Sequence, residues 1–333
     1  MKSRSLYAAA LIALACLGVA LGYLMRAQPV PPISAAARPM PMRRNAAPPV
    51  VADPLRSAPS AIPAGSPMLG AIERLCDLLE RHAARAGDLG ALKAALLAAD
   101  PAEAIAAIRR FLRTGRDAAT GQEFTIAAGG TLSGAPTLRL MLLDVLGQIA
   151  RKSRSDAASA VAREILADKS SADEWALALR NVAWTEPQPR TFLADKMREM
   201  LRYEPWRAAP SAGMLEALDV VVFTKDASLV PDLDQARAAG NELAHAADIA
   251  LDRLAEAAPL NVLTFLNTHP AQLNDRPFLR ADYFAKADLS DGAQRAQIEI
   301  YLGRPDISLA EKSKLLRALT ALASFVGDSL LTA

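Results

Sequence analysis

From residue 68 to the end of the chain, apolar residues recur at the spacing of an α-helix, and this pattern restricts the fold more than any other feature. Ile72, Leu75, Cys76 and Leu79 fall at positions i, i+3, i+4 and i+7, which places them on one face of a helix. Ala and Leu are the leading apolar residues here, and both favour helices over strands. The sequence therefore predicts an all-α body over residues 68–333, with the Cys76 thiol buried and unreactive.

Capping signals and prolines separate the helices of this body. Three segments have the spacing of a capping box, in which the N-cap side chain and the third helical residue exchange hydrogen bonds with backbone amides: Asp100–Glu103, Ser171–Glu174 and Ser308–Glu311. Apolar stripes predict further helices near Leu138–Ile149 and Val161–Leu166, and over residues 188–202, 211–223, 241–257 and 292–302. Breaks are expected at Pro187, Pro205, Pro210, Pro231, Pro259, Pro270 and Pro305.

Many helices joined by short connections predict stacked antiparallel helical hairpins. In architecture this body resembles the α-solenoids built from HEAT-like repeats. The phrases Ala135–Arg139, Glu174–Arg180 and Glu204–Trp206 are similar to those of uncharacterised bacterial envelope proteins, a resemblance that implies no activity. No strict sequence period is present, and a compact, non-repeating helical domain is the alternative.

One stretch, residues 115–134, departs from the helical pattern. It contains five glycines, with Phe124-Thr125-Ile126 between them. We expect a short hairpin or an ordered loop that packs Phe124 and Ile126 into the core. The lysine and Ser/Thr spacing of a phosphate-binding P-loop is absent, so a structural role is favoured over a ligand-binding one.

The N-terminus predicts a membrane anchor. Residues 6–25 form an uncharged, mostly apolar run of 20 residues, which as a helix spans roughly 30 Å, the thickness of a bilayer core. Lys2 and Arg4 precede the run and favour a cytoplasmic tail over residues 1–5. Gly18 and Gly22 have the G-x-x-x-G spacing that lets two membrane helices pack as a homodimer.

Two alternatives to an uncleaved anchor remain open at this point. The first is a cleaved signal peptide, for which the small residues 35–37 are a cleavage site, although its apolar region is usually shorter, at about 7–15 residues. The second is a lipoprotein modified at Cys16, since residues 13–16 resemble a lipobox. The expected location is the bacterial inner membrane, as a single-pass protein with the bulk of the chain in the periplasm.

Residues 26–67 read as a disordered, Pro-rich tether. The segment 27–67 holds 11 of the 22 prolines, which block helices and strand ladders and favour extended polyproline II.

The N-terminal region and the body differ in net charge. Residues 1–67 carry seven basic residues against Asp53 alone, a net of +6, so the overall +2 leaves −4 for the rest. A mildly acidic body does not fit a nucleic-acid binder.

The sequence offers no recognisable catalytic chemistry. His82, His245 and His269 are the only histidines, and they form neither a zinc pair nor a haem-attachment motif with cysteine. We therefore expect no metal, no cofactor and no enzymatic activity. Two alternatives stay open: an envelope enzyme acting through acidic residues, and an assembly or regulatory subunit of a membrane complex.

Aromatic residues gather in the middle of the body, at Trp175, Trp184, Tyr203, Trp206 and Phe223. Such residues usually fill the core between helices, and we expect the same here. If some are exposed, Trp184, Tyr203 and Trp206 are the candidate residues for binding a partner. The favoured function is a membrane-anchored scaffold that binds an envelope protein or peptide through its helical body.

Overall fold

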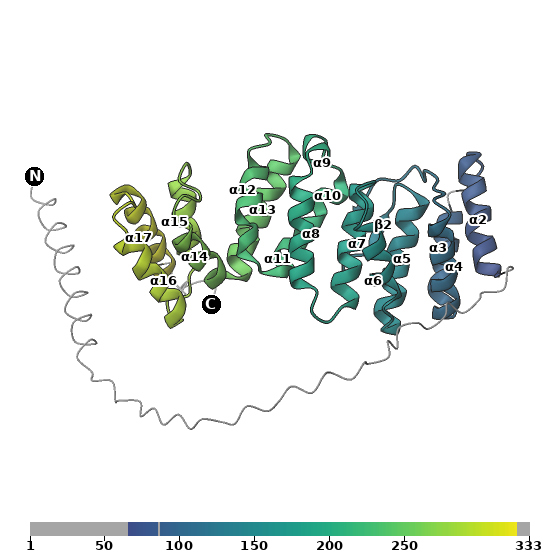
Figure 1. Ribbon diagram of the computed structural model, residues 1–333, viewed down its shortest axis with the longest axis horizontal. Coiled ribbons are helices and arrows are strands. Elements are labelled where there is room, and N and C mark those ends of the chain that lie inside the picture. The colour runs from purple at the N-terminus through teal and green to yellow at the C-terminus, as the bar shows by residue number, and fades with distance from the viewer. Residues whose placement is uncertain (1–65, 86, 325–333) are drawn as a thin grey trace, which may run out of the picture. The chain divides into compact units, whose positions relative to one another are not determined.

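The computed structural model describes residues 66–85 and 87–324, with side chains to residue 320. The described chain is helical apart from one short hairpin of two strands (Figure 1). The first half contains α2 (Pro67–Glu80), α3 (Asp88–Ala98), α4 (Pro101–Arg113), β1 (Thr125–Ile126), β2 (Leu132–Gly134), α5 (Leu138–Ser153), α6 (Ala157–Ile165), α7 (Ala172–Thr185) and α8 (Arg190–Arg202). The second half contains α9 (Glu204–Ala208), α10 (Ala212–Ala217), α11 (Asp219–Thr224), the 3-10 helix η1 (Ala227–Leu229), α12 (Val230–Arg237), α13 (Glu242–Ala257), α14 (Pro259–Thr268), α15 (Pro277–Ala285), α16 (Gly292–Gly303) and α17 (Leu309–Ser324).

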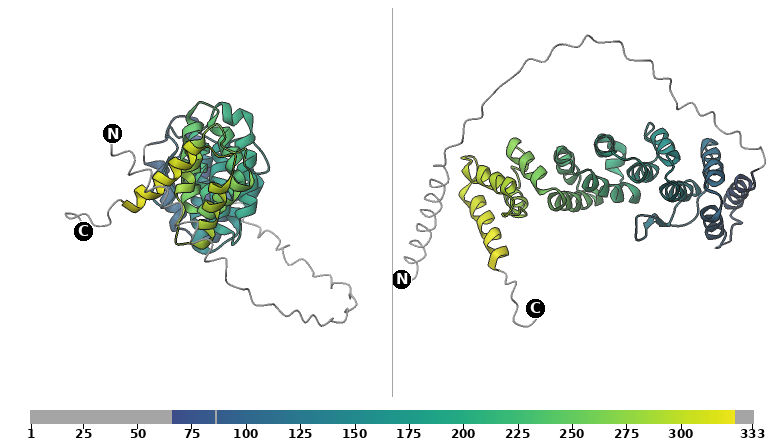
Figure 2. Two further views of the ribbon diagram at one scale, coloured as in Figure 1. Left: turned by 90° about the vertical axis from the view of Figure 1, so that its left-hand side faces the viewer. Right: turned by 90° about the horizontal axis from the view of Figure 1, so that it is seen from below.

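Each helix packs on helices that are near it in the sequence. Helix α4 contacts α2 and α5, α7 contacts α5, α6 and α10, and α13 contacts α11 and α12. Farther along the chain, α14 contacts α16 and α15 contacts α17. The views in Figures 1 and 2 show the same helix-beside-helix packing. The predicted mostly α-helical body with many packed helix pairs is therefore confirmed.

Two apolar clusters form the core and adjoin at α6 and α7. One cluster runs from Leu69 to Val161 and includes Leu177 of α7. The other runs from Ala162 to Leu315. The partly buried side chain of Ile165 packs against both clusters. Cys76 is fully buried in the first cluster, as its place on the apolar stripe predicted.

The three predicted N-cap side chains accept hydrogen bonds from the first turn of their helices, but the capping boxes form only in part. The Asp100 side chain accepts from the amides of Ala102 and Glu103, and Ser171 and Ser308 accept from the third helical amide. Each such cap stabilises a helix by roughly 1 kcal/mol. The glutamates, however, bind other helices or loops instead of returning to the N-cap amide. Glu103 accepts from Ser66, Glu174 pairs with Arg139, and Glu311 pairs with Arg280.

The glycine-rich stretch contains a two-stranded antiparallel hairpin, β1–β2. Gly129 and Gly130 have φ values of +83° and +77° at its turn, a conformation that other residues rarely adopt. Phe124 is buried, as predicted, but Ile126 is 42% exposed. The expectation that both side chains enter the core is therefore wrong for Ile126. Residues two apart in a regular strand point to the same face, but the register is irregular between Thr125 and Ile126, so Ile126 does not follow Phe124 into the core.

Several predictions fall outside the described residues. These are the span at 6–25, Cys16, Gly18, Gly22 and the tether up to residue 65. Within residues 66–85 and 87–324, no helix is both long enough and apolar enough to cross a bilayer. Helix α2 begins at Pro67 with Ser66 as its N-cap residue, one residue before the boundary predicted for the body.

Candidate functional site

The aromatic residues selected from the sequence are mostly packed inside the domain, but Phe223 is 42% exposed, so the expectation that it fills the core is wrong. Trp206 is buried and meets the fully buried Trp175 edge-to-face, with ring centroids 5.3 Å apart. Tyr203 is half-buried and also meets Trp206 edge-to-face, at 4.9 Å. The Trp175 indole donates to the carbonyl of Asp168. Trp206 and Tyr203 thus anchor α9 against α7, and their geometry is that of a core cluster.

Trp184 has a different role, because it holds the hairpin against the helices. Its half-buried ring lies beside the guanidinium groups of Arg180 and Arg151, at 4.2 and 4.9 Å from the ring centroid. A Cβ added to Gly130 would lie 3.3 Å from the ring. The glycine at the hairpin turn therefore lets the backbone approach the indole closely.

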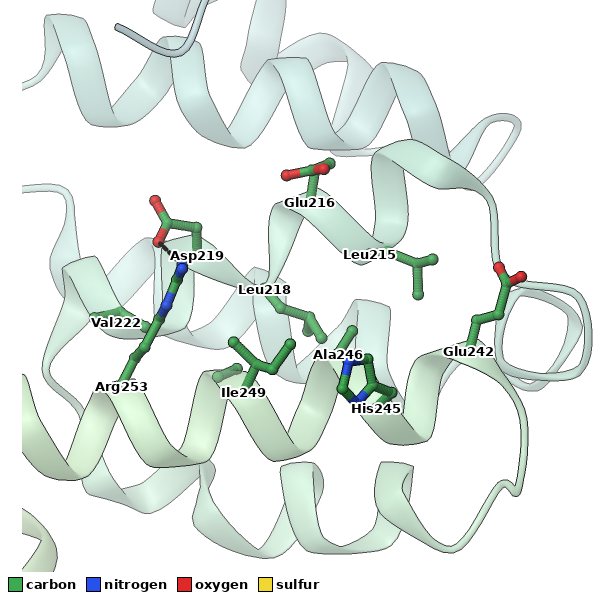
Figure 3. Close-up of a pocket in the computed structure, with 11 residues that line it drawn as sticks. Leu215, Glu216, Leu218, Asp219, Val222, Glu242, His245, Ala246, Ile249 and Arg253 are labelled. Carbon is green, nitrogen blue, oxygen red and sulfur yellow. Dashed lines mark ion pairs between the residues drawn. The ribbon is translucent and has the colours of Figure 1, made fainter. Parts of the chain in front are cut away.

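A hollow lies between α10, α11 and α13, with a volume of about 460 Å³. Figure 3 shows Leu218 and Ile249 near its centre, with Leu215 and Ala246 beside them. Ile249 is 41% exposed although it belongs to a helix with a well-buried opposite face. Exposed aliphatic side chains within a polar rim are typical of contact surfaces.

The rim of this hollow is mainly acidic. It carries Glu216, Asp219 and Glu242, and the one arginine, Arg253, lies 3.7 Å from the Asp219 carboxylate. Among the described residues, Glu216 and Glu242 have no ion-pair partner. His245 also lines the rim. The hollow therefore combines an apolar floor with two uncompensated carboxylates.

Two further hollows adjoin the first, and Arg253 lines all three. One, of about 330 Å³, extends toward the hairpin and α7 and is lined by Phe124, Ile126 and Arg180. The other, of about 620 Å³, extends toward α15 and is lined by Leu279 and Tyr283. We call these three adjoining hollows the groove. It draws residues from the hairpin and from α7, α10, α11, α12, α13 and α15, which are up to about 160 residues apart in the sequence.

A buried carboxylate fixes the hairpin wall of the groove. Asp144 of α5 is fully buried and accepts hydrogen bonds from the Leu132 amide at 3.1 Å and from Arg180 at 2.8 Å. Lys93 and Gln148 also donate to it, at 3.0 and 2.7 Å. Burial lowers the pKa of Arg180, and the nearby Asp144 charge opposes that shift. Asp144 is thus shared by Arg180 and Lys93, and it holds both cations at the hairpin wall.

The α15 end of the groove is built on a second buried arginine. The Arg237 side chain is 1% exposed and forms ion pairs with Asp234, at 3.1 Å, and with Asp248. Burial raises the pKa of Asp234, an effect that the charge of Arg237 opposes. Burial also raises the pKa of Tyr283, so this phenol stays protonated at neutral pH.

The described residues contain no group of three His, Cys, Asp or Glu side chains that could hold a metal ion. His245 lines the groove, and His269 stacks on Phe265 with ring centroids 4.0 Å apart. His82 lies at the surface with a φ of +54°. The three histidines therefore lie at three separate places in the fold.

No family model matches the chain, and neither a curated protein nor a solved structure matches it. Trp184, Tyr203 and Trp206 are buried or half-buried. The groove instead exposes Ile126 and Ile249, which the sequence did not indicate as binding residues.

Proposed function

We propose that this protein is a membrane-anchored envelope scaffold whose groove binds a segment of a partner protein. One observation carries the proposal: three adjoining hollows share lining residues across the hairpin and six helices. A surface of this kind suits an extended partner better than a small, enclosed ligand, because contacts are spread over several successive helices. A binding surface of this type needs no catalytic group.

In this proposal the helical body is an α-solenoid with HEAT-like architecture. Support comes from the packing of each helix on near neighbours in the sequence, such as α13 on α11 and α12. Solenoids of stacked helix pairs commonly use one continuous surface, built from successive helices, for recognition. The groove is built in this way, from α7, α10, α11, α12, α13 and α15.

The proposal also places the scaffold at the bacterial inner membrane, with the body in the periplasm. Residues 6–25 provide the span, and Lys2 and Arg4 orient it. The Pro-rich segment 26–67 then acts as a spacer, whose contour could exceed roughly 100 Å at about 3.1 Å per residue. Gly18 and Gly22 give the anchor a dimerisation face.

A substitution in the floor of the groove tests the binding function. Ile249→Arg puts a charge among the aliphatic residues, and we expect recovery of the partner from mild detergent to fall by about tenfold. Leu78→Arg is the matched control, because Leu78 is 39% exposed against 41% for Ile249 but lies on α2, outside the groove. Both variants should keep the helical circular dichroism of the unmodified chain.

Two results would contradict the binding function. In the first, Ile249→Arg recovers the same partner, identified by mass spectrometry, as efficiently as Leu78→Arg. In the second, the protein turns over an envelope substrate, and Glu216→Gln abolishes that turnover without loss of fold. The second result would support the enzyme alternative.

The mass of the mature protein tests the anchor separately. We expect an intact N-terminus that retains residues 6–25, together with integral-membrane fractionation. A new N-terminus near residue 38 would indicate a cleaved signal peptide, and a lipid on Cys16 would indicate a lipoprotein.

A further inference from the structure

We infer that the segment bound in the groove carries an aliphatic side chain with lysine or arginine on both sides of it. This inference rests on the proposed binding function and specifies the chemistry of the partner. It follows from how apolar and charged side chains are distributed in the groove.

The centre of the groove is aliphatic and is the size of a side-chain pocket. Leu215, Leu218, Val222 and Ile249 line the central hollow of about 460 Å³, and no aromatic side chain does. An aliphatic anchor buried there would lose most of its contact with water. Removing one Leu or Ile side chain from water therefore favours binding.

Carboxylates flank this aliphatic centre at separate places. Figure 3 shows Glu216 on α10 and Glu242 at the start of α13, on either side of Leu215. Both glutamates are exposed, and neither has an ion-pair partner among the described residues. Arg253 is the only arginine of the central hollow, and it faces Asp219 at 3.7 Å. The free charges around the aliphatic centre are therefore negative.

Toward α15 the charges of the lining balance, with three carboxylates and three arginines. Asp252 and Glu256 share a single lysine, Lys286, at 2.8 and 2.7 Å. Asp248 is paired with the buried Arg237. Over the whole groove, six carboxylates face four arginines, and the excess of two negative charges matches the unpaired Glu216 and Glu242 of the central hollow.

This charge distribution selects among partners. Lysine or arginine placed beside an aliphatic anchor would meet Glu216 and Glu242, whereas acidic segments, nucleic acids and anionic lipid surfaces would be repelled. Because the carboxylates are exposed, each ion pair adds little to the affinity and weakens with salt. Affinity should therefore come from the aliphatic anchor, and selectivity from the basic residues that flank it.

Short labelled peptides, titrated against the full chain in mild detergent, test the inference. The first peptide has a central leucine with two lysines on each side, in a Gly/Ser background. The second replaces the lysines with glutamates, and the third replaces the leucine with serine. We expect the first peptide to bind at least about tenfold more tightly than either of the others, and its binding to weaken with added salt.

A double variant assigns the selectivity to the two carboxylates. Glu216→Gln with Glu242→Gln should weaken binding of the lysine peptide by about threefold to tenfold, which is the effect of two exposed charge pairs. Glu204→Gln with Glu299→Gln is the matched control. It removes the same charge from exposed positions on α9 and α16, outside the groove.

Three results would overturn the inference: equal binding of the three peptides, no binding tighter than about 1 mM, or equal effects of the two double variants. None of these results would contradict the proposed function. That function is tested separately, by whether Ile249→Arg lowers the recovery of a natural partner. A natural partner lost in Ile249→Arg but unaffected by Glu216→Gln with Glu242→Gln would support the scaffold and reject the basic flanks.

Discussion

Arg280 of α15 and Glu311 of α17 form a bidentate ion pair that is buried from solvent. The two contacts, from Nε to Oε1 and from Nη2 to Oε2, measure 2.8 and 3.1 Å. The two residues are 3% and 1% exposed. Tyr301 donates to the same carboxylate, and Asn274 accepts from the guanidinium. The pair therefore connects three helices and a loop near the C-terminal end of the described chain.

Removing one member of this pair should lower the stability of the fold. Glu311→Gln leaves the Arg280 charge buried without its counter-charge, so we expect a loss of about 3–5 kcal/mol in the free energy of unfolding. Glu256→Gln is the control, because the Glu256 side chain is 60% exposed beside Lys286, and such pairs contribute at most about 1 kcal/mol. Denaturant unfolding followed by circular dichroism measures both. Equal losses would show that the buried pair has no special role.

Asp144 should control the order of the hairpin wall. Asp144→Asn removes the charge that holds Lys93 and Arg180 and weakens the acceptor for the Leu132 amide. We expect faster hydrogen exchange over residues 125–134 and weaker binding in the groove. Asp77→Asn is the control, because the Asp77 side chain is 44% exposed, against 0% for Asp144, and pairs with Arg116. Unchanged exchange in the hairpin would contradict this role.

The Cys76 thiol should be inert and should contribute stability that depends on pH. Burial, helped by a hydrogen bond to Glu80, raises the pKa of Cys76 from 9.0 to about 11. A pKa raised in the folded state means that the contribution is full below about pH 9 and is lost as pH rises toward about 11. In a Cys16→Ser background, we expect a thiol reagent at pH 8 to react only at the rate of local opening.

The stability difference between that background and its Cys76→Ala derivative should shrink between pH 9 and 11. Fast labelling of the folded chain at pH 8 would contradict the burial of the thiol.

Gly213 should resist substitution because α10 lies close to α7. A Cβ at this position would lie 2.8 Å from the Cα of Asp173, whose side chain accepts from the Gly213 amide. We expect Gly213→Ala to cost about 1–3 kcal/mol. Gly90→Ala on α3 is the contrast, because nothing lies within 4 Å of the added Cβ. This substitution should raise the free energy of unfolding by about 0.5–1 kcal/mol. Thermal unfolding compares the stability of the two variants. A Gly213→Ala variant as stable as the unmodified chain would show that α10 can shift.

Helix starts could be predicted where a capping side chain precedes an apolar stripe. Asp100, Ser171 and Ser308 mark α4, α7 and α17 correctly. Helices α12, α14 and α15 were missed; breaks were expected at Pro231 and Pro259, and Pro277 has no capping side chain before it. In the structure these prolines occupy the first turn of α12, α14 and α15, where a missing amide costs nothing. Helix α3 was missed because its Ala and Leu residues leave no clear polar face.

The single helix predicted over residues 211–223 is two short helices, α10 and α11. Leu218 lies between them and keeps right-handed helical dihedral angles. The amides of Leu218 and Val221 donate to carbonyls three residues earlier, at 3.3 and 3.1 Å, so the helix tightens locally. Apolar periodicity does not report a change of this kind.

The groove could not be predicted from the sequence, because its residues come from elements far apart in the chain. One local signal was present. On α13 the buried residues Leu243, Ala247, Ala250 and Leu254 form one stripe, and Ile249 lies on another face. An isolated isoleucine off the stripe indicates an exposed apolar group, but only the packing of α10 and α11 beside α13 makes it part of a groove.

The most direct test of the groove is photo-crosslinking from its two exposed isoleucines in living cells. A photoreactive residue at position 126 on the hairpin, or at position 249 on α13, should capture one and the same partner protein. Position 78 on α2 should not capture it. Addition of a charge at Ile249 should abolish the crosslink from position 126. Different proteins captured from the two positions, or equal capture from position 78, would contradict a continuous binding groove.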